Sequence, residues 1–164
     1  MKQDEISTEL AKYRDLGCFN LAVSYFIAAS SLASTQEKNS RDATHPQSPI
    51  RVLCKHSIEQ YLKSYLFLKD NSKSEYTFNL GGDLKELEEK CTKKGLEFSE
   101  EDKEVISIFW KNTQSSNALF ISGNGGEVVD IFDALKTCDN LHYQIKPQMN
   151  QKRTHLFPIY ESAN

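Results

Sequence analysis

The segment from Pro49 to Lys69 constrains the fold more than any other part of this chain. Most of its apolar residues recur at steps of three and four, the spacing that gathers side chains on one face of an α-helix. The residues at this spacing are Ile50, Leu53, Cys54, Ser57, Ile58, Tyr61, Leu62, Tyr65, Leu66 and Leu68. No Gly or Pro follows Pro49 in the segment, and Ser48 is suited to the N-cap position. At a rise of about 1.5 Å per residue the helix would be about 30 Å long, so we expect it to be the core helix.

A second helix is expected before the core helix, from about Ile6 to Ser34. Its apolar residues also recur at three- and four-residue steps. The face that they mark carries Leu10, Tyr13, Leu16, Asn20, Leu21, Ser24, Tyr25, Ala28 and Leu32. Gly17 lies inside this helix, where a glycine costs about 1 kcal/mol relative to alanine, and indicates a kink or a close contact with another helix.

Three later helices are expected, and the first two of them have recognisable capping residues. Asp83 is placed to cap the first of them, with Glu86 positioned to complete a capping box, and Gly95 ends it. Ser99 is placed to cap the next. The three helices are expected from Asp83 to Lys94, from Ser99 to about Ser115, and from about Glu127 to Leu141.

The length of 164 residues is that of one domain, large enough to bury a core without disulfides or metals. We predict an all-α fold, an up-and-down bundle of four to five helices, over residues 1–146. Beyond Tyr143 the chain carries Pro147 and Pro158 and lacks clear periodicity. Residues 147–164 are therefore expected to form a loosely packed C-terminal tail.

Charge and cysteine content limit the classes of function. The net charge is −3 and the pI is near 5.8, so the chain lacks the overall basic surface typical of proteins that bind nucleic acid through its phosphates alone. The four cysteines are far apart in the sequence, and neither they nor the histidines have the spacing of a metal site. We expect reduced cysteines, no metal and no cofactor, in a cytoplasmic protein.

The apolar stretch Phe19–Ala33 is not expected to enter a membrane. Four acidic residues precede it, whereas a signal peptide begins with basic residues. Asn20 and several serines interrupt the stretch, which is also too short to span a bilayer. The sequence therefore predicts a buried helix here and no membrane partner.

Residues 49–66, PIRVLCKHSIEQYLKSYL, resemble the signature helix of HEPN domains, helical-bundle proteins associated with nucleotide binding. That helix often has a proline, then a His-small-apolar-Glu run and a Leu-Lys pair before a small residue. The matching residues here are His56, Ile58, Glu59, Leu62, Lys63 and Ser64. A second element follows at the expected distance, as Gly81-Gly82-Asp83-Leu84, Gly95-Leu96 and Ser99-Glu100. Gly82 stands where the family often has histidine, and the resemblance covers about residues 46–102.

The resemblance implies a bundle that often forms a homodimer through its long helices. It also implies a setting in prokaryotic toxin–antitoxin, defence or stress systems, with RNA, a nucleotide or a protein encoded nearby as the partner. A nucleotidyltransferase sometimes accompanies such proteins. It would be a separate chain, because its Gly-Ser and Asp-x-Asp residues are absent here.

Many HEPN proteins are ribonucleases that need no metal and use an arginine and a histidine four to six residues apart. Arg51 and His56 have this spacing. Arginine can hold a phosphate through two hydrogen bonds, and histidine can act as acid or base on a 2′-OH. Five residues of helix turn through about 500°, however, so the two side chains would point about 140° apart. A dimer could bring them together; the alternative is a solvated Arg51 with a packed His56.

Lys55, Glu59 and Lys63 on the same helix are candidate binding residues. They are four residues apart, a pattern more typical of a solvated helix face than of a ligand site. We therefore expect a HEPN-like binding or regulatory module. One alternative is a ribonuclease that uses Arg51 and His56 across a dimer, and another is a helical protein-interaction module without nucleotide binding.

Overall fold

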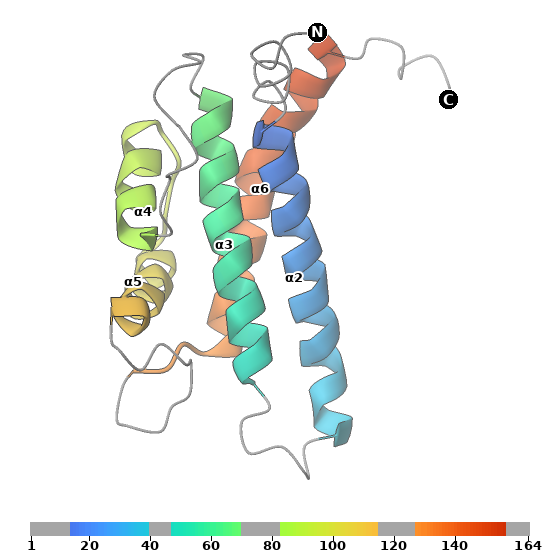
Figure 1. Ribbon diagram of the computed structural model, residues 1–164, viewed down its shortest axis with the longest axis vertical. Coiled ribbons are helices and arrows are strands. Elements are labelled where there is room, and N and C mark those ends of the chain that lie inside the picture. The colour runs from blue at the N-terminus through green and yellow to red at the C-terminus, as the bar shows by residue number, and fades with distance from the viewer. Residues whose placement is uncertain (1–13, 40–46, 70–82, 115–126, 157–164) are drawn as a thin grey trace, which may run out of the picture.

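The computed structural model describes residues 14–39, 47–69, 83–114 and 127–156. These residues form five helices and no strand, which confirms the expected all-α bundle. The helices are α2 (Arg14–Asn39), α3 (Ser48–Lys69), α4 (Leu84–Lys93), α5 (Glu100–Gln114) and α6 (Ile131–Leu156). The long helices α2, α3 and α6 lie side by side, and the shorter α4 and α5 lie on the far side of α3 from α2 (Figure 1).

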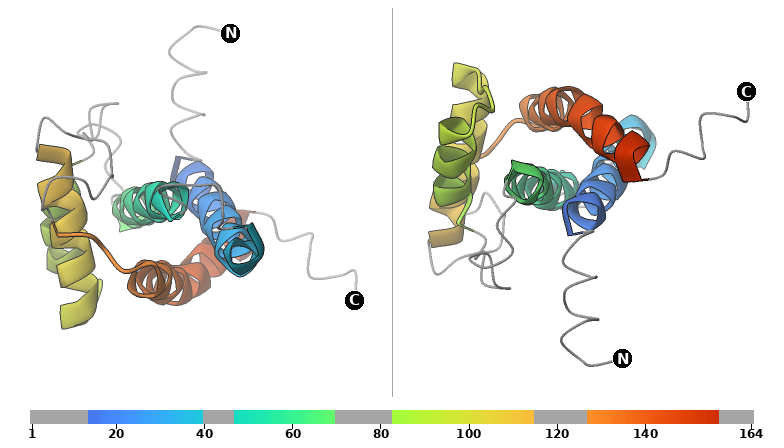
Figure 2. Two further views of the ribbon diagram at one scale, coloured as in Figure 1. Left: turned by 90° about the horizontal axis from the view of Figure 1, so that it is seen from below. Right: turned by 90° about the horizontal axis from the view of Figure 1, so that it is seen from above.

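α3 is the central helix of the bundle. It contacts α2, α4 and α6, and the end-on views show it between these helices (Figure 2). α2 runs antiparallel to α3, whereas α6 runs parallel to it (Figure 1). Two contacts at opposite ends of the bundle agree with these directions. Arg51, near the start of α3, contacts Val129 just before α6, and Lys152, near the end of α6, pairs with Asp15 at the start of α2.

The burial of α3 follows from its central position. No residue between Ile50 and Leu68 is exposed. The side chains without accessible surface include Ile50, Cys54, Ile58, Tyr61, Leu62 and Leu66. Burying one large apolar side chain stabilises a fold by about 1.5–3 kcal/mol, so α3 supplies much of the driving force for folding. The prediction of a core helix over this segment is confirmed.

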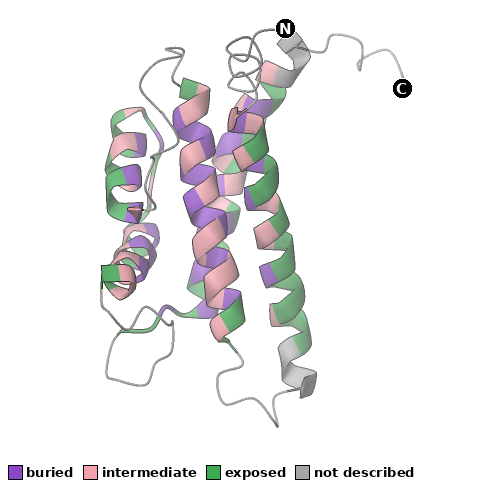
Figure 3. Ribbon diagram, in the orientation of Figure 1, coloured by how far each residue is buried: buried purple, intermediate pink, exposed green. Residues whose placement is uncertain are grey.

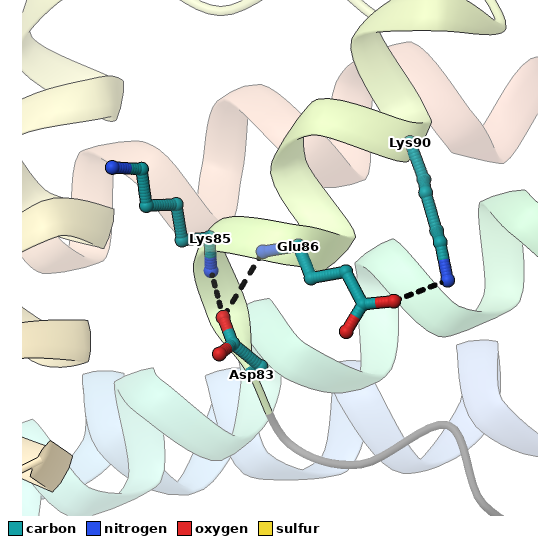
Figure 4. Close-up of polar contacts among 4 residues, drawn as sticks. All are labelled: Asp83, Lys85, Glu86 and Lys90. Atoms are coloured by element: carbon teal, nitrogen blue, oxygen red, sulfur yellow. Dashed lines mark hydrogen bonds and ion pairs between the residues drawn. The ribbon is translucent and has the colours of Figure 1, made fainter.

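At the start of α4 the structure confirms the predicted N-cap residue but shows a different partner for the Glu86 side chain. The Asp83 carboxylate accepts hydrogen bonds from the backbone N–H groups of Lys85 and Glu86, at 3.1 and 3.0 Å (Figure 4). These bonds confirm Asp83 as the N-cap, and the bond from Glu86 is the main reason why the pKa of this carboxyl is lowered. The Glu86 side chain instead pairs with Lys90, at 2.5 Å (Figure 4). The reciprocal half of the expected capping box is therefore replaced by an ion pair one turn along α4.

α5 begins with a complete capping box. The Ser99 hydroxyl accepts from the Asp102 N–H at 3.1 Å, and the Asp102 carboxylate accepts from the Ser99 N–H at 3.0 Å. Asp102 also accepts from the Asn140 side chain at 3.2 Å, which ties the start of α5 to α6. Gly95, with φ of 91°, follows the end of α4 as predicted.

α6 is longer than the sequence predicts, because it ends at Leu156 and not near Leu141. Ile145 and Met149 are buried, so the second half of the helix packs in the core. Pro147 lies inside the helix on its exposed side. A proline there removes one backbone hydrogen bond, and the burial of its apolar neighbours offsets this cost.

The predicted C-terminal tail needs a corresponding correction. Residues 147–156 belong to α6, and only residues 157–164 lie outside the described part of the chain. The first part of the predicted N-terminal helix, residues 1–13, and the Gly81-Gly82 pair of the HEPN-like element also lie outside it.

α2 has a different orientation from the one we predicted. Phe19, Ala22 and Ala29 are buried, whereas Leu21 and Leu32 on the predicted inward face are 44% and 41% exposed. The predicted buried helix is therefore buried along one face only. By length and composition alone, the segment Arg14–Thr35 could cross a membrane, and in the bundle one of its faces packs on α3.

Candidate functional site

Three polar residues form a row on α3, which we call the α3 polar strip: His56, Glu59 and Lys63. Glu59 lies between the other two and interacts with both. Its Oε1 is 2.5 Å from Lys63 Nζ, and its Oε2 is 4.0 Å from His56 Nδ1. The helix brings them together because residues three and four apart are neighbours on its surface.

Burial differs sharply along the strip. The side chains of Glu59 and Lys63 are only 12% and 16% exposed, whereas that of His56 is 42% exposed. The expectation of a solvated row is therefore wrong for Glu59 and Lys63, which form a largely dehydrated ion pair. Lys55, one turn before Glu59, is half-buried on the same helix, but the ion pair of Glu59 is with Lys63.

α2 supplies the neighbours of the strip. The Tyr25 ring lies beside the His56 imidazole, with 5.5 Å between the ring centroids. Cys18 lies close enough to the other end of the strip for its thiol to interact electrostatically with Lys63. Burial raises the pKa of the Cys18 thiol and Lys63 opposes this effect, so the thiol is not activated as a nucleophile.

The strip is suited to holding a polar ligand. Glu59 Oε2 lies 4.0 Å from His56 Nδ1, which is beyond hydrogen-bonding distance, so this contact leaves the ring nitrogens of the half-exposed imidazole able to hydrogen-bond elsewhere. The Tyr25 ring adds a flat aromatic surface next to this imidazole. Hydrogen-bonding and stacking groups are thus adjacent, the combination with which proteins bind a nucleotide base.

Arg51 belongs to a different environment from His56. Its Nε donates to the Val129 carbonyl at 2.6 Å, and an Nη donates to the Gln47 side chain at 2.9 Å. Partial burial lowers the pKa of Arg51, and Asp130 opposes that shift. Arg51 therefore holds the start of α3 against the segment before α6 and is partly buried, whereas His56 faces α2. Within a single chain, Arg51 and His56 therefore contact different parts of the bundle, although they have the nuclease-like spacing in the sequence.

The sequence did not predict a partly buried polar pair between α3 and α6. The Tyr61 hydroxyl lies 2.8 Å from Nδ1 of His142, and the Phe19 ring stacks on the same imidazole at 5.6 Å. Burial raises the pKa of Tyr61 and lowers the pKa of His142, so both groups are neutral near pH 7. Tyr61 has no accessible surface and His142 is partly exposed, so the pair joins α3 to α6 at the edge of the core.

The remaining reactive side chains are also engaged in packing. All four cysteines are free thiols, and Cys54, Cys91 and Cys138 are buried. Burial raises the pKa of the Cys91 thiol to about 12, which makes it an inert apolar group. In the part of the chain that the structure describes, no group of three or more His, Cys, Asp or Glu residues could hold a metal ion.

In comparisons with known proteins, no family model, curated protein or solved structure matches this chain. The candidate site therefore stands on the geometry of the α3 polar strip.

Proposed function

We propose that this chain is a HEPN-like binding and regulatory module that takes up a nucleotide unit, free or within RNA, at the α3 polar strip. The observation that carries the proposal is the half-exposed His56 beside the Tyr25 ring, with Glu59 behind it. In this arrangement the base stacks on the aromatic surface and hydrogen-bonds to the imidazole, while Lys63, two turns further along α3, is held in its ion pair with Glu59.

Binding has more support than catalysis. Cleavage of RNA without a metal needs a cation on the phosphate beside the acid–base group. Arg51, the arginine at the nuclease-like spacing, is bound to the Val129 carbonyl and the Gln47 side chain. Recruiting it to a substrate would break both hydrogen bonds, so the ribonuclease alternative has less support than a binding role.

The proposal includes the biological setting that the HEPN resemblance implies. The module acts as a homodimer in the cytoplasm, in a defence, stress or toxin–antitoxin context, and its regulatory partner is encoded nearby. The partner chain supplies any nucleotidyltransferase chemistry, because the residues of that reaction are absent from this sequence.

Fluorescence anisotropy with two probes tests the proposal: a labelled single-stranded RNA and a labelled ATP, both without metal. We expect saturable binding of at least one probe and a loss of about tenfold in affinity for His56→Ala, which corresponds to about 1.4 kcal/mol. Lys136→Ala on α6 is the matched control, because it removes an exposed cation that interacts with Glu101 of α5 and belongs to neither helix that forms the site. Circular dichroism verifies that each variant is folded.

Two results would count against the proposal. One is the absence of saturable binding to either probe, and the other is equal binding by wild type and His56→Ala. Gel analysis of the same RNA distinguishes the enzyme alternative: cleavage by wild type that is lost in both Arg51→Ala and His56→Ala would make the chain a ribonuclease.

A further inference from the structure

α2 rests on α3 through small side chains. Ala22 and Ala29 have no accessible surface, and the Ser57 hydroxyl of α3 donates to the Ala22 carbonyl at 2.9 Å. The outer side of α2 is exposed, and its buried residues lie where it faces the other long helices (Figure 3). Helices lock together when ridges of side chains on one fit between those of the other, and alanines form only low ridges. The alanine contact therefore brings α2 close to α3 but does little to fix the rotation of α2 about its own axis.

Larger side chains flank the alanines on both sides of this contact. On one side the Tyr25 ring lies beside His56 of α3. On the other side Phe19 and Phe26 lie beside His142 of α6, with 5.6 and 6.5 Å between the ring centroids. Each residue of a helix turns the chain by about 100°, so the alanines lie between the Tyr25 edge and the Phe26 edge. The rotation of α2 is thus set at two edges, each of which packs an aromatic side chain against a histidine.

The two edges differ in burial. Phe19 is 6% exposed, and its ring stacks on the His142 imidazole with 23° between the ring planes. The imidazole is also held independently of α2, because its Nδ1 lies 2.8 Å from the hydroxyl of the buried Tyr61. At the other edge the side chain of His56 is 42% exposed, so water competes for its contact with Tyr25. Aromatic packing stabilises more where it removes surface from water, so the His142 edge governs the rotation of α2.

We propose that His142 is a positioning residue for the α3 polar strip. By packing against Phe19 and Phe26, it fixes the rotation of α2 at which the Tyr25 ring lies beside His56. Tyr25 and Phe26 are consecutive residues of one helix, so a turn of α2 moves both rings together. The nucleotide site therefore depends on a residue of α6 that lies outside the strip, at the opposite edge of α2.

This inference deepens the proposed function and rests on it for its effect on ligand binding. The placement of Tyr25 beside His56 is nevertheless a property of the chain without ligand, and it can be measured separately. Two interactions of His142 are candidates for the positioning: its ring contacts with α2 and its hydrogen bond with Tyr61. Only the ring contacts reach α2, so a variant that keeps a ring at position 142 should keep the site.

Nuclear magnetic resonance of the ligand-free full chain, labelled at histidine, tests the placement of Tyr25. The Tyr25 ring shifts the imidazole signals of His56 through its ring current. Tyr25→Ala therefore gives the position of these signals without the ring, and His56→Ala identifies them. His142→Gln keeps an acceptor for the Tyr61 hydroxyl but has no ring, so we expect it to move the His56 signals most of the way to their position in Tyr25→Ala. Phe26→Leu, which removes one ring from the α2 side, should move them in the same direction by a smaller amount.

The same variants are tested with the RNA and ATP probes. We expect His142→Gln to weaken the binding of a probe by about threefold to tenfold, and His142→Phe, which retains a ring beside α2, to remain within about twofold of wild type. Leu87→Ala is the matched control, because it removes buried apolar atoms from α4, which packs on α3 and α5. It lowers stability without changing the contacts of α2, so the His56 signals should stay in place. Circular dichroism verifies that each variant is folded.

Either of two results would overturn the inference. One is that the His56 signals keep their wild-type position in both His142→Gln and Phe26→Leu. The other is that Leu87→Ala displaces these signals as far as His142→Gln does, because any loss of stability would then loosen α2. Failure of the proposed function looks different: neither probe binds, while the His56 signals still respond to His142→Gln.

Discussion

α2 and α3 are antiparallel neighbours of similar length, yet their composition and burial are opposite. α3 carries five charged or titratable residues that are buried or partly buried. They are Arg51, Lys55, His56, Glu59 and Lys63. α2 has no charged residue between Asp15 and Glu37, yet one of its faces is exposed. Hydrophobic content alone therefore does not identify the central helix of this bundle.

The difference has two physical causes. α3 is covered by α2, α4 and α6, whereas α2 packs mainly on α3 and, to a lesser extent, on α6. In addition, the polar groups of α3 have partners that allow their burial: Ser57 donates to the Ala22 carbonyl and Lys63 pairs with Glu59. A central helix can thus contain polar residues when its neighbours satisfy them.

Replacing one large residue on each helix by alanine tests this contrast most strongly. Tyr61 has no accessible surface and packs its ring edge against Phe19, so Tyr61→Ala should lower the free energy of unfolding by about 3–5 kcal/mol. Leu21 is 44% exposed, and Leu21→Ala should cost well under half of that in the monomer. Urea denaturation of both variants at low protein concentration measures the two values.

Similar losses in the two variants would contradict the contrast. They would mean that Leu21 is covered in solution by a partner that persists at low concentration. Repeating the Leu21→Ala measurement at several protein concentrations distinguishes this case, because the cost of losing an intermolecular contact depends on concentration.

Acid should weaken the contact between α3 and α6 through His142. Burial and, secondarily, Lys146 lower the pKa of His142 in the folded state, while Asp139 opposes this shift. Between the folded and unfolded pKa values the unfolded chain binds more protons, so stability rises with pH. The contribution is complete above the unfolded pKa of about 6.5 and is lost as the pH falls through the folded pKa.

His142→Gln keeps a hydrogen-bond acceptor for the Tyr61 hydroxyl but cannot titrate. The free energy of unfolding, measured by urea denaturation from about pH 5 to 8, should therefore fall less with acid in this variant than in wild type. Equal slopes for the two proteins would show that His142 does not couple protonation to folding.

The parts of the fold that the sequence predicts are those set by nearby residues. The periodicity of α3 and the caps at Asp83 and Ser99 depend on residues no more than a few positions apart, and the structure has all three. The row of His56, Glu59 and Lys63 is local in the same sense. Its burial is not, because that depends on how α2 and the rest of the bundle pack around α3.

The features that the sequence did not predict depend on distant residues or on a choice between similar faces. Tyr61 and His142 are 81 positions apart, so no local pattern connects them. α2 has apolar residues on two faces, and periodicity alone does not decide which one contacts α3. In α6 the proline at position 147 suggested an end to the helix, whereas the burial of Met149 keeps the chain helical beyond it.

Gly17 gives the smallest expected effect and the most local test of the contrast. Apart from its chain neighbours and the backbone of its own helix, a Cβ atom at this position would meet no atom of the described residues within 4 Å, so their packing does not require a glycine here. Gly17→Ala should therefore stabilise the monomer by about 0.5–1 kcal/mol through helix propensity. Gly95→Ala provides the opposite control, since φ of 91° at Gly95 strains any other residue. Urea denaturation at low concentration measures both changes. A loss of stability in Gly17→Ala would contradict the open surroundings of Gly17 and would mean that another element packs closely against α2 at this position.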